Sequence, residues 1–225
     1  MDILQAIELR HSVRSYREAP IEEAKIETLR AAVADCNRAS GLHIGLITQE
    51  PRAFGGRMAH YGKFTGVNNY FAMIGDKNDP LLDEKIGYYG ERLVLHAQRL
   101  GLNTCWVALT YKKVASALNM GKNEKLRCVI ALGYGTTAGV ARKSKSPEQV
   151  SHCDQATAPA WFTRGVEAAL LAPTAMNQQK FHFTLHNENL VDAETSWGFY
   201  ARIDLGIAKY HFEQGAGRDN FEWLT

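Results

Sequence analysis

The chain has 225 residues, of which 45% are apolar and 22% charged, and its formal net charge is +2. This composition is typical of a globular protein with a sizeable core, and it excludes a mainly disordered chain. A net charge so close to zero does not favour bulk attraction to nucleic acid, and the length allows one large α/β domain or two small ones.

The first part of the chain alternates helical and strand patterns. Apolar residues recur at helical spacing at Ile26, Leu29 and Val33, and again between Ile86 and Leu100. The expected elements, in chain order, are a helix over residues 3–9, a helix over 20–36, a strand over 42–48, a glycine-rich loop over 51–67, a strand over 70–75, a helix over 83–100, an apolar segment over 104–109, a short helix over 111–118 and an interior strand over 128–132.

An extended basic connection, residues 136–157, is expected to separate this part, residues 1–135, from a shorter second part, residues 158–225. The expected elements of the second part are a helix from Pro159 that ends before Pro173, a strand over 181–185 and a helix that opens at Asp204. We interpret Trp197, Phe199 and Tyr200 as strand and core residues.

The second part resembles the first in the order of its elements. Residues 181–183 align with 42–44, residues 204–207 with 85–88, and residues 217–223 with 101–106. We therefore predict an internal duplication, although two α/β units also look alike by chance.

Cysteine spacing and hydropathy exclude several classes of protein. The four cysteines form no CxxC pair, so no zinc or thioredoxin-type site is expected, and we predict no metal. His182 and His186 are predicted to be structural residues of a strand. The N-terminus carries Asp2 and Glu8 and lacks a long apolar stretch, and no run approaches the roughly 20 apolar residues of a membrane span. The expected location is the cytoplasm.

Four short segments combine residues that suit an anionic or heteroaromatic ligand. Arginines and a hydroxyl alternate in residues 10–14, and on an extended segment alternate side chains point to one side. Residues 172–179 read APTAMNQQ, a turn that exposes amides and backbone groups. Residues 101–106 read GLNTCW, and residues 141–145 read ARKSK. For each segment taken alone, an ordinary turn, helix end or solvated basic loop is at least as good an explanation as a ligand-binding role.

Together the four segments resemble the nitroreductase family, whose members carry Arg-x-Ser-x-Arg/Lys, Ala-Pro-Ser-x-x-Asn-x-Gln-Pro, Gly-Leu-Gly-Thr-Cys-Trp and basic tail segments. The resemblance implies an α+β fold with a mostly antiparallel sheet covered by helices.

In this family each flavin is shared, because one subunit supplies the Arg-Ser-Arg segment and the other the Pro-Ser-x-x-Asn turn. Here residues 34–40 have lost the proline of that turn, and no Arg-x-Ser-x-Arg precedes Pro159. Such complementary losses predict a fused pseudo-dimer with one flavin mononucleotide (FMN) in a cleft between the copies. Lys180 replaces a family proline, so the resemblance does not define the residues on the substrate side of the site.

The resemblance also implies the chemistry. NADH or NADPH would reduce FMN, and a nitroaromatic, quinone or similar small molecule would then be reduced, with no side chain needed as nucleophile or base. Arg14 would stabilise the anionic reduced flavin, and Arg10 with Arg142 or Lys143 would hold the phosphate. The implied cofactor-binding residues are Arg10, His11, Ser12, Arg14, Trp106, Val107, Ala108, Arg142, Lys143, Pro173, Thr174, Ala175, Asn177 and Gln178.

Three alternatives stay open at this point. They are a flavin-binding or storage protein without turnover, a specialised flavin enzyme of the dehalogenase or flavin-cleaving type, and an α/β domain without flavin. We expect no nucleic-acid or membrane partner, and a monomer or a weak homodimer.

Overall fold

The computed structural model describes residues 1–153 and 158–224. Contacts divide the chain into two compact units, and neither is continuous in sequence. Unit 1 comprises Met1–Leu9, Asp83–Glu91 and Arg142–Thr225, and unit 2 comprises Arg10–Leu82 and Arg92–Ala141. Two short segments of the expected first half, Met1–Leu9 and Asp83–Glu91, therefore belong to the unit that contains the expected second half.

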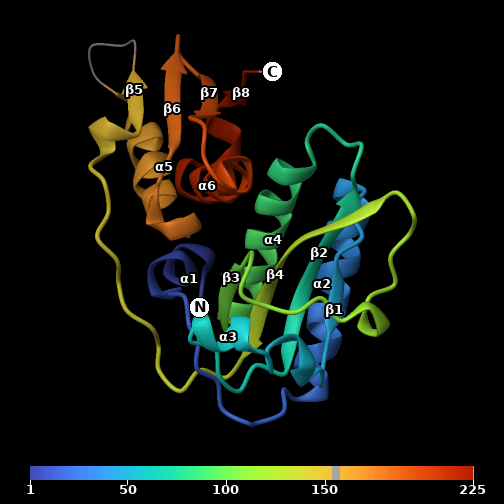
Figure 1. The fold of residues 1–225 in the computed structure, drawn as a ribbon. Helices are drawn as coiled ribbons and strands as arrows, with labels where there is room; N and C mark the ends of the chain where they lie inside the picture. Colours follow the sequence, from blue (N-terminus) through green and yellow to red (C-terminus); the bar gives the residue numbers. More distant parts are fainter. Residues whose placement is uncertain (154–157, 225) are drawn as a thin grey trace. The chain divides into compact units, whose positions relative to one another are not determined.

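Unit 2 is built on an antiparallel sheet with the strand order β1-β2-β4-β3 (Figure 1). Its strands are β1 (Gly45–Ile47), β2 (Asn69–Asp76), β3 (Asn103–Val107) and β4 (Glu124–Gly133). Its helices are α2 (Glu23–Ser40), α3 (Arg57–Tyr61), the C-terminal part of α4 (Leu82–Arg99) and the 3-10 helices η1 (Pro51–Ala53) and η2 (Ala115–Ala117). β2 is buried along almost its whole length, because side chains pack on both faces of the sheet.

Unit 1 contains a mixed sheet with the order β5-β6-β7-β8, in which only the central pair is antiparallel. Its strands are β5 (Ser151–Cys153), β6 (Phe181–His186), β7 (Leu190–Thr195) and β8 (Glu222–Trp223). Its helices are α1 (Ile3–Leu9), α5 (Ala160–Leu170), α6 (Ala201–Ala216), the N-terminal part of α4 and the 3-10 helices η3 (Pro147–Gln149), η4 (Ala175–Asn177) and η5 (Arg218–Asn220). Phe183 and Phe212 stack with ring centroids 4.6 Å apart, which joins β6 to α6 in an aromatic core.

Two glycines of unit 1 let α4 and α6 approach closely. A Cβ on Gly87 would lie 2.0 Å from the carbonyl oxygen of Ile203, and a Cβ on Gly206 would lie 2.0 Å from that of Glu84. The contact is reciprocal, because each glycine meets the carbonyl three residues before the other glycine. Such self-complementary contacts are typical of a two-fold interface.

The structure confirms the α+β class, and most of the expected elements are present. The helix over 3–9 has the expected bounds, and Asp2 Oδ1 accepts a hydrogen bond of 2.9 Å from Gln5 N at its start. When the short helices η1, α3, η4 and η5 are left aside, α2, β1, β2, α4 and β3 follow the same order as α5, β6, β7, α6 and β8. Within the described ranges no helix is both long and apolar enough to cross a membrane.

Three expectations about segments are wrong. The loop over 51–67 contains η1 and α3, since the Glu50 carboxylate accepts hydrogen bonds from Arg52 N and Ala53 N and so starts a helical turn. The helix expected over 111–118 shrinks to η2, because Lys112 N donates to Ala53 O instead of to a helical partner. The extended connection contains η3 and β5 before residues 154–157, which lie outside the described residues.

Candidate functional site

The turn that follows α5 is held in an unusual backbone conformation. Met176, Asn177 and Gln179 have φ angles of 52°, 55° and 43°, in the left-handed region. A non-glycine residue in this region costs roughly 1–3 kcal/mol, and such residues collect at functional sites. The turn over residues 173–179 therefore depends on the hydrogen bonds that hold it.

Asp204, in the first turn of α6, holds one side of this turn. Its Oδ1 accepts a hydrogen bond of 2.9 Å from Ala175 N, and its Oδ2 accepts one of 2.7 Å from Gln178 Nε2. Burial raises the pKa of Asp204 to about 6, although both hydrogen bonds oppose this shift. The sequence pattern predicts for Asp204 only a place at the start of a helix. The available signal was an acidic residue inside the apolar stretch 203–208.

Gln179 joins the other side of the turn to the basic segment 142–145. Lys145 N donates to Gln179 Oε1 at 2.8 Å, Lys145 Nζ donates to Gln179 O at 2.6 Å, and Gln179 Nε2 donates to Ser144 Oγ at 2.9 Å. Asn177 Nδ2 donates to Lys143 O at 2.7 Å. Two of the four segments predicted from the sequence therefore lie side by side in unit 1. Asn177 and Gln178, which were expected to contact the ligand, also hold the turn together.

Arg142 and Lys143, the two cations of the basic segment that were expected to hold the phosphate, have different surroundings. The Arg142 guanidinium donates to the carbonyl oxygens of Leu170, at 3.3 Å, and Ala172, so it caps the C-terminal end of α5. Lys143 is exposed, and within residues 1–153 and 158–224 its ammonium group makes no hydrogen bond or ion pair. Lys143 is therefore better placed than Arg142 to bind an external anion.

Two aromatic side chains project from the segment beside this turn. Lys180 Nζ donates to Trp197 O at 2.7 Å, and Gln178 Nε2 donates to Phe199 O at 2.9 Å. The side chains of Trp197 and Phe199 are 86% and 77% exposed, and their ring centroids are 6.1 Å apart. The expectation that residues 197–200 belong to a strand and the core is wrong, because these hydrogen bonds hold a turn that directs both rings outward.

The other two predicted segments lie together in unit 2. Ser12 forms a parallel bridge with Thr104 of β3, and Val13 N donates to Thr104 O at 3.0 Å. Gly139 packs over this segment, because a Cβ there would lie 2.6 Å from the Cβ of His11. Residues 12 and 13 therefore lie beside the edge strand β3, which begins within the GLNTCW segment.

The side chains of these two segments differ in their access to a ligand. Of the three side chains expected on one face, Ser12 and Arg14 are exposed, whereas Arg10 is only 3% exposed. The Arg14 guanidinium lies over the Phe64 ring, 5.9 Å from its centroid. Val107 is buried in the core, so only its backbone can contact a ligand, and Trp106 and Ala108 are half-buried.

Comparison with known proteins identifies the family. A family model described as "Putative TM nitroreductase" matches residues 2–216. The chain belongs to this nitroreductase family. Among solved structures, a "putative nitroreductase" from Thermotoga maritima is 21% identical, with 97% of this chain and 85% of that chain covered and a TM-score of 0.70.

Nitroreductase structures from other organisms are similar over a smaller part of the chain. A "Putative NADH dehydrogenase/NAD(P)H nitroreductase" from Bacteroides thetaiotaomicron is 20% identical, covering 68% of this chain and 97% of that chain, with a TM-score of 0.54. A protein with the same description from Parabacteroides distasonis is 24% identical, covering 66% of this chain and 97% of that chain, with a TM-score of 0.51. No curated protein matches the sequence. These likenesses show that this member of the nitroreductase family has the nitroreductase fold.

Proposed function

We propose that the chain is an FMN-dependent oxidoreductase that uses NADH or NADPH to reduce a planar aromatic acceptor such as a nitroaromatic or a quinone. The observation that carries this proposal is the pairing of the strained turn 173–179 with the basic segment 142–145 in unit 1. Family membership and the descriptions of the Bacteroides and Parabacteroides structures support the choice of reaction.

The donor groups of the chain suit FMN. A phosphate needs a cation that can approach it, and the Lys143 ammonium is exposed and makes no ion pair within the described residues. An electron-rich carbonyl edge needs hydrogen-bond donors and positive charge, and exposed Ser12 and Arg14 provide them. Asn177 Oδ1 and the backbone N–H of Thr174, which make no hydrogen bond within the described residues, would contribute polar contacts at the turn.

The bound FMN would supply the redox chemistry by accepting a hydride from NAD(P)H and passing electrons to the acceptor. The residues of the chain bind and orient, and the positive charge of Arg14 favours the negatively charged reduced flavin over the neutral oxidised form. No nucleophile is required. Burial raises the pKa of the Cys105 thiol, which keeps this cysteine in the unreactive protonated form.

The exposed aromatic pair supports the choice of acceptor. Trp197 and Phe199 present their rings to solvent, and they are attached to the proposed flavin-binding turn through Gln178 and Lys180. Aromatic rings stack on planar ligands, and each such contact contributes about 0.5–1.5 kcal/mol beyond the area buried. We infer that planar aromatic acceptors bind more tightly than compact inorganic ones such as ferricyanide.

The reciprocal glycine contact supports the proposal of one fused site per chain. Gly87 and Gly206 occupy equivalent positions in the predicted duplication, and each meets the backbone of the other helix in the same way. In a dimer of identical subunits a two-fold axis produces such pairs. We propose that the chain is an internally duplicated pseudo-dimer, with α4 and α6 as equivalent helices.

Two measurements on the purified protein test the proposed activity. A flavin absorption spectrum, together with NAD(P)H oxidation that depends on menadione or nitrofurazone, would support the oxidoreductase. A bound flavin without turnover would indicate a storage or sensor protein, and turnover confined to a halogenated substrate or to flavin itself would indicate a specialised enzyme. A colourless protein that does not bind added FMN would overturn the proposal.

Lys143→Ala tests the observation that carries the proposal. Loss of a charge-assisted hydrogen bond to phosphate costs about 1.5–3 kcal/mol, so FMN affinity should fall about tenfold or more. Lys113→Ala, which removes an exposed lysine from unit 2, is the matched control and should leave the affinity unchanged. Equal FMN affinity in wild type and Lys143→Ala, measured by fluorescence titration of the apoprotein, would exclude the assigned role.

A further inference from the structure

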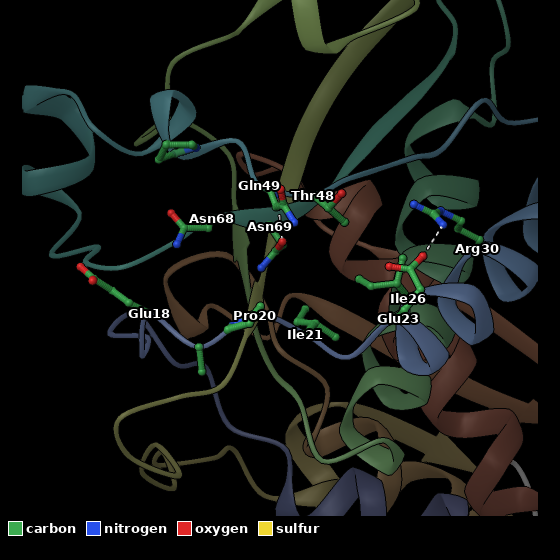
Figure 2. A pocket seen from close by; sticks show the side chains of 12 residues that line it. Glu18, Pro20, Ile21, Glu23, Ile26, Arg30, Thr48, Gln49, Asn68 and Asn69 are labelled. Carbon is green, nitrogen blue, oxygen red and sulfur yellow. Dashed lines mark hydrogen bonds and ion pairs between the residues drawn. The ribbon is translucent and has the colours of Figure 1, made fainter.

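A cavity in unit 2 contains none of the residues assigned to the flavin. It has a volume of about 340 Å³ and lies among the start of α2, the end of β1 and the segment that leads into β2 (Figure 2). This volume is at the low end of the range for small-molecule pockets, so the cavity suits one small ligand rather than a peptide.

Three carboxamide side chains line the cavity, and one of them is almost entirely buried. Asn69 is 8% exposed, and its Oδ1 accepts a hydrogen bond of 3.2 Å from Gln49 N. Its NH₂ group donates no hydrogen bond to any residue in the described ranges. In Figure 2 the Asn69 side chain lies between Gln49 and Pro20 at the cavity. The NH₂ group is accessible at the cavity and is therefore free to donate to a bound acceptor.

The neighbouring polar groups are also available to a ligand. The side chains of Thr48, Gln49 and Asn68 line the cavity and make no hydrogen bond within residues 1–153 and 158–224. Glu50 N donates to Asn68 O at 2.8 Å, which fixes the two lining segments against each other. Gln49 has a φ angle of 54°, a strained conformation of the kind found at binding sites.

The rest of the lining restricts the charge and shape of the ligand. Apolar side chains of Pro20, Ile21, Ile26 and Pro51 provide surface for the face of a ring. Arg30 at the margin pairs with Glu23, at 3.0 Å, and with Glu27, so its charge is already neutralised. Glu18 adds a further negative charge, which disfavours a phosphate or carboxylate.

We propose that this cavity binds an uncharged planar heterocycle with a hydrogen-bond acceptor beside a donor, the chemistry shared by nucleobases and nicotinamide. Carboxamides match such an edge because each offers both a donor and an acceptor. The Asn69 NH₂ group donates to the ligand, Gln49, Asn68 and Thr48 complete its polar contacts, and the apolar side chains contact its ring. The proposal does not depend on flavin binding.

Calorimetric titration of the purified full chain tests the proposal, with adenosine, uridine and nicotinamide as probes and AMP as the anionic counterpart of adenosine. At least one uncharged probe should bind saturably, and AMP should bind more weakly than adenosine. Asn69→Asp keeps the acceptor for Gln49 N but removes the NH₂ donor and adds negative charge, so it should lower the affinity about tenfold or more. Thr48→Val and Asn68→Ala change partly exposed positions and should lower it less.

Asn119→Ala, an exposed amide in unit 2 away from the cavity, is the control and should bind like wild type. If Asn69→Asp unfolds, Thr48→Val and Asn68→Ala decide the question on folded protein. The proposal is overturned by the absence of saturable binding of every uncharged probe, by AMP binding more tightly than adenosine to the Lys143→Ala variant, which lacks the proposed phosphate contact, or by unchanged affinity in all the cavity variants.

Discussion

Asp204 shows how one buried carboxylate shapes a turn that the sequence presents as a simple helix end. It accepts hydrogen bonds from Ala175 and Gln178 while it is only 3% exposed. The turn needs these acceptors because its left-handed residues carry strain that the rest of the structure must offset. Asp204 is thus a positioning residue for the proposed flavin contacts.

The pH dependence of stability follows from the burial of Asp204. Its pKa is raised from 3.8 to about 6 in the folded protein, so the folded state retains a proton that the unfolded state releases between these values. Its stabilising contribution is therefore complete below about pH 4 and is lost as pH rises through 6. The loss amounts to about 3 kcal/mol, at 1.36 kcal/mol per pKa unit.

Urea unfolding of wild type and Asp204→Asn at pH values from 4 to 7.5 measures this contribution. Because the variant does not titrate at residue 204, the stability of wild type relative to the variant should decline as pH rises. A difference that is independent of pH would show that Asp204 does not titrate in this range.

Arg14 is predicted to act on redox rather than on affinity. Arg14→Gln keeps much of the shape and removes the charge, so the reduction potential of bound FMN should become more negative, by on the order of 30 mV or more, since 30 mV corresponds to about 1.4 kcal/mol for a two-electron couple. Reduction by NAD(P)H should slow while oxidised FMN stays bound. Photoreduction against a reference dye gives the potential. Arg17→Gln removes an equal charge from an exposed neighbour and should leave the potential near the wild-type value.

At the scale of elements, the crossing of α4 and α6 depends on glycine. In an exposed helix, replacing glycine with alanine stabilises by up to about 1 kcal/mol. At Gly206 the new Cβ would lie 2.0 Å from Glu84 O, a backbone atom that cannot move without shifting the helix.

Gly206→Ala should therefore lower the free energy of unfolding, by about 1–3 kcal/mol, against the helix-propensity trend. Ala31→Gly, in an exposed part of α2, calibrates that trend, because it should also destabilise the protein but only by about 1 kcal/mol. Chemical denaturation measures both variants. Stabilisation by Gly206→Ala would contradict the close helix contact.

Elements with strong periodicity could be predicted from the sequence, whereas segments set by distant hydrogen bonds could not. The helical spacing of apolar residues predicts α4, and a continuous apolar run predicts the buried strand β2. The exposure of Trp197 was not, because it follows from the bond of Lys180 to a carbonyl 17 residues away. Within the candidate site, the four motifs located the segments, but the unequal access of Arg10 and Arg14 and the role of Asp204 required tertiary structure.

At the scale of the whole molecule, the distribution of motifs predicts how many flavins the chain binds. A two-fold dimer of single nitroreductase units has two equivalent sites, each built from an Arg-Ser-Arg segment and a Pro-Ser-x-x-Asn-type turn. This chain carries one such arginine segment, residues 10–14, and one such proline turn, residues 173–178. With the duplication proposed above, the chain therefore carries the components of one flavin site and not of two.

We therefore expect one FMN per chain in a protein that does not require a second copy to bind it. Flavin released by denaturation and quantified against protein gives the ratio, and chromatography of the released flavin distinguishes FMN from flavin adenine dinucleotide. The ratio should stay near one when light scattering shows a monomer, because both components belong to the same chain. A ratio near two would contradict the single fused site. A ratio near one half, found only in a dimer, would instead mean that two chains share one flavin and that the pseudo-dimer is not self-sufficient.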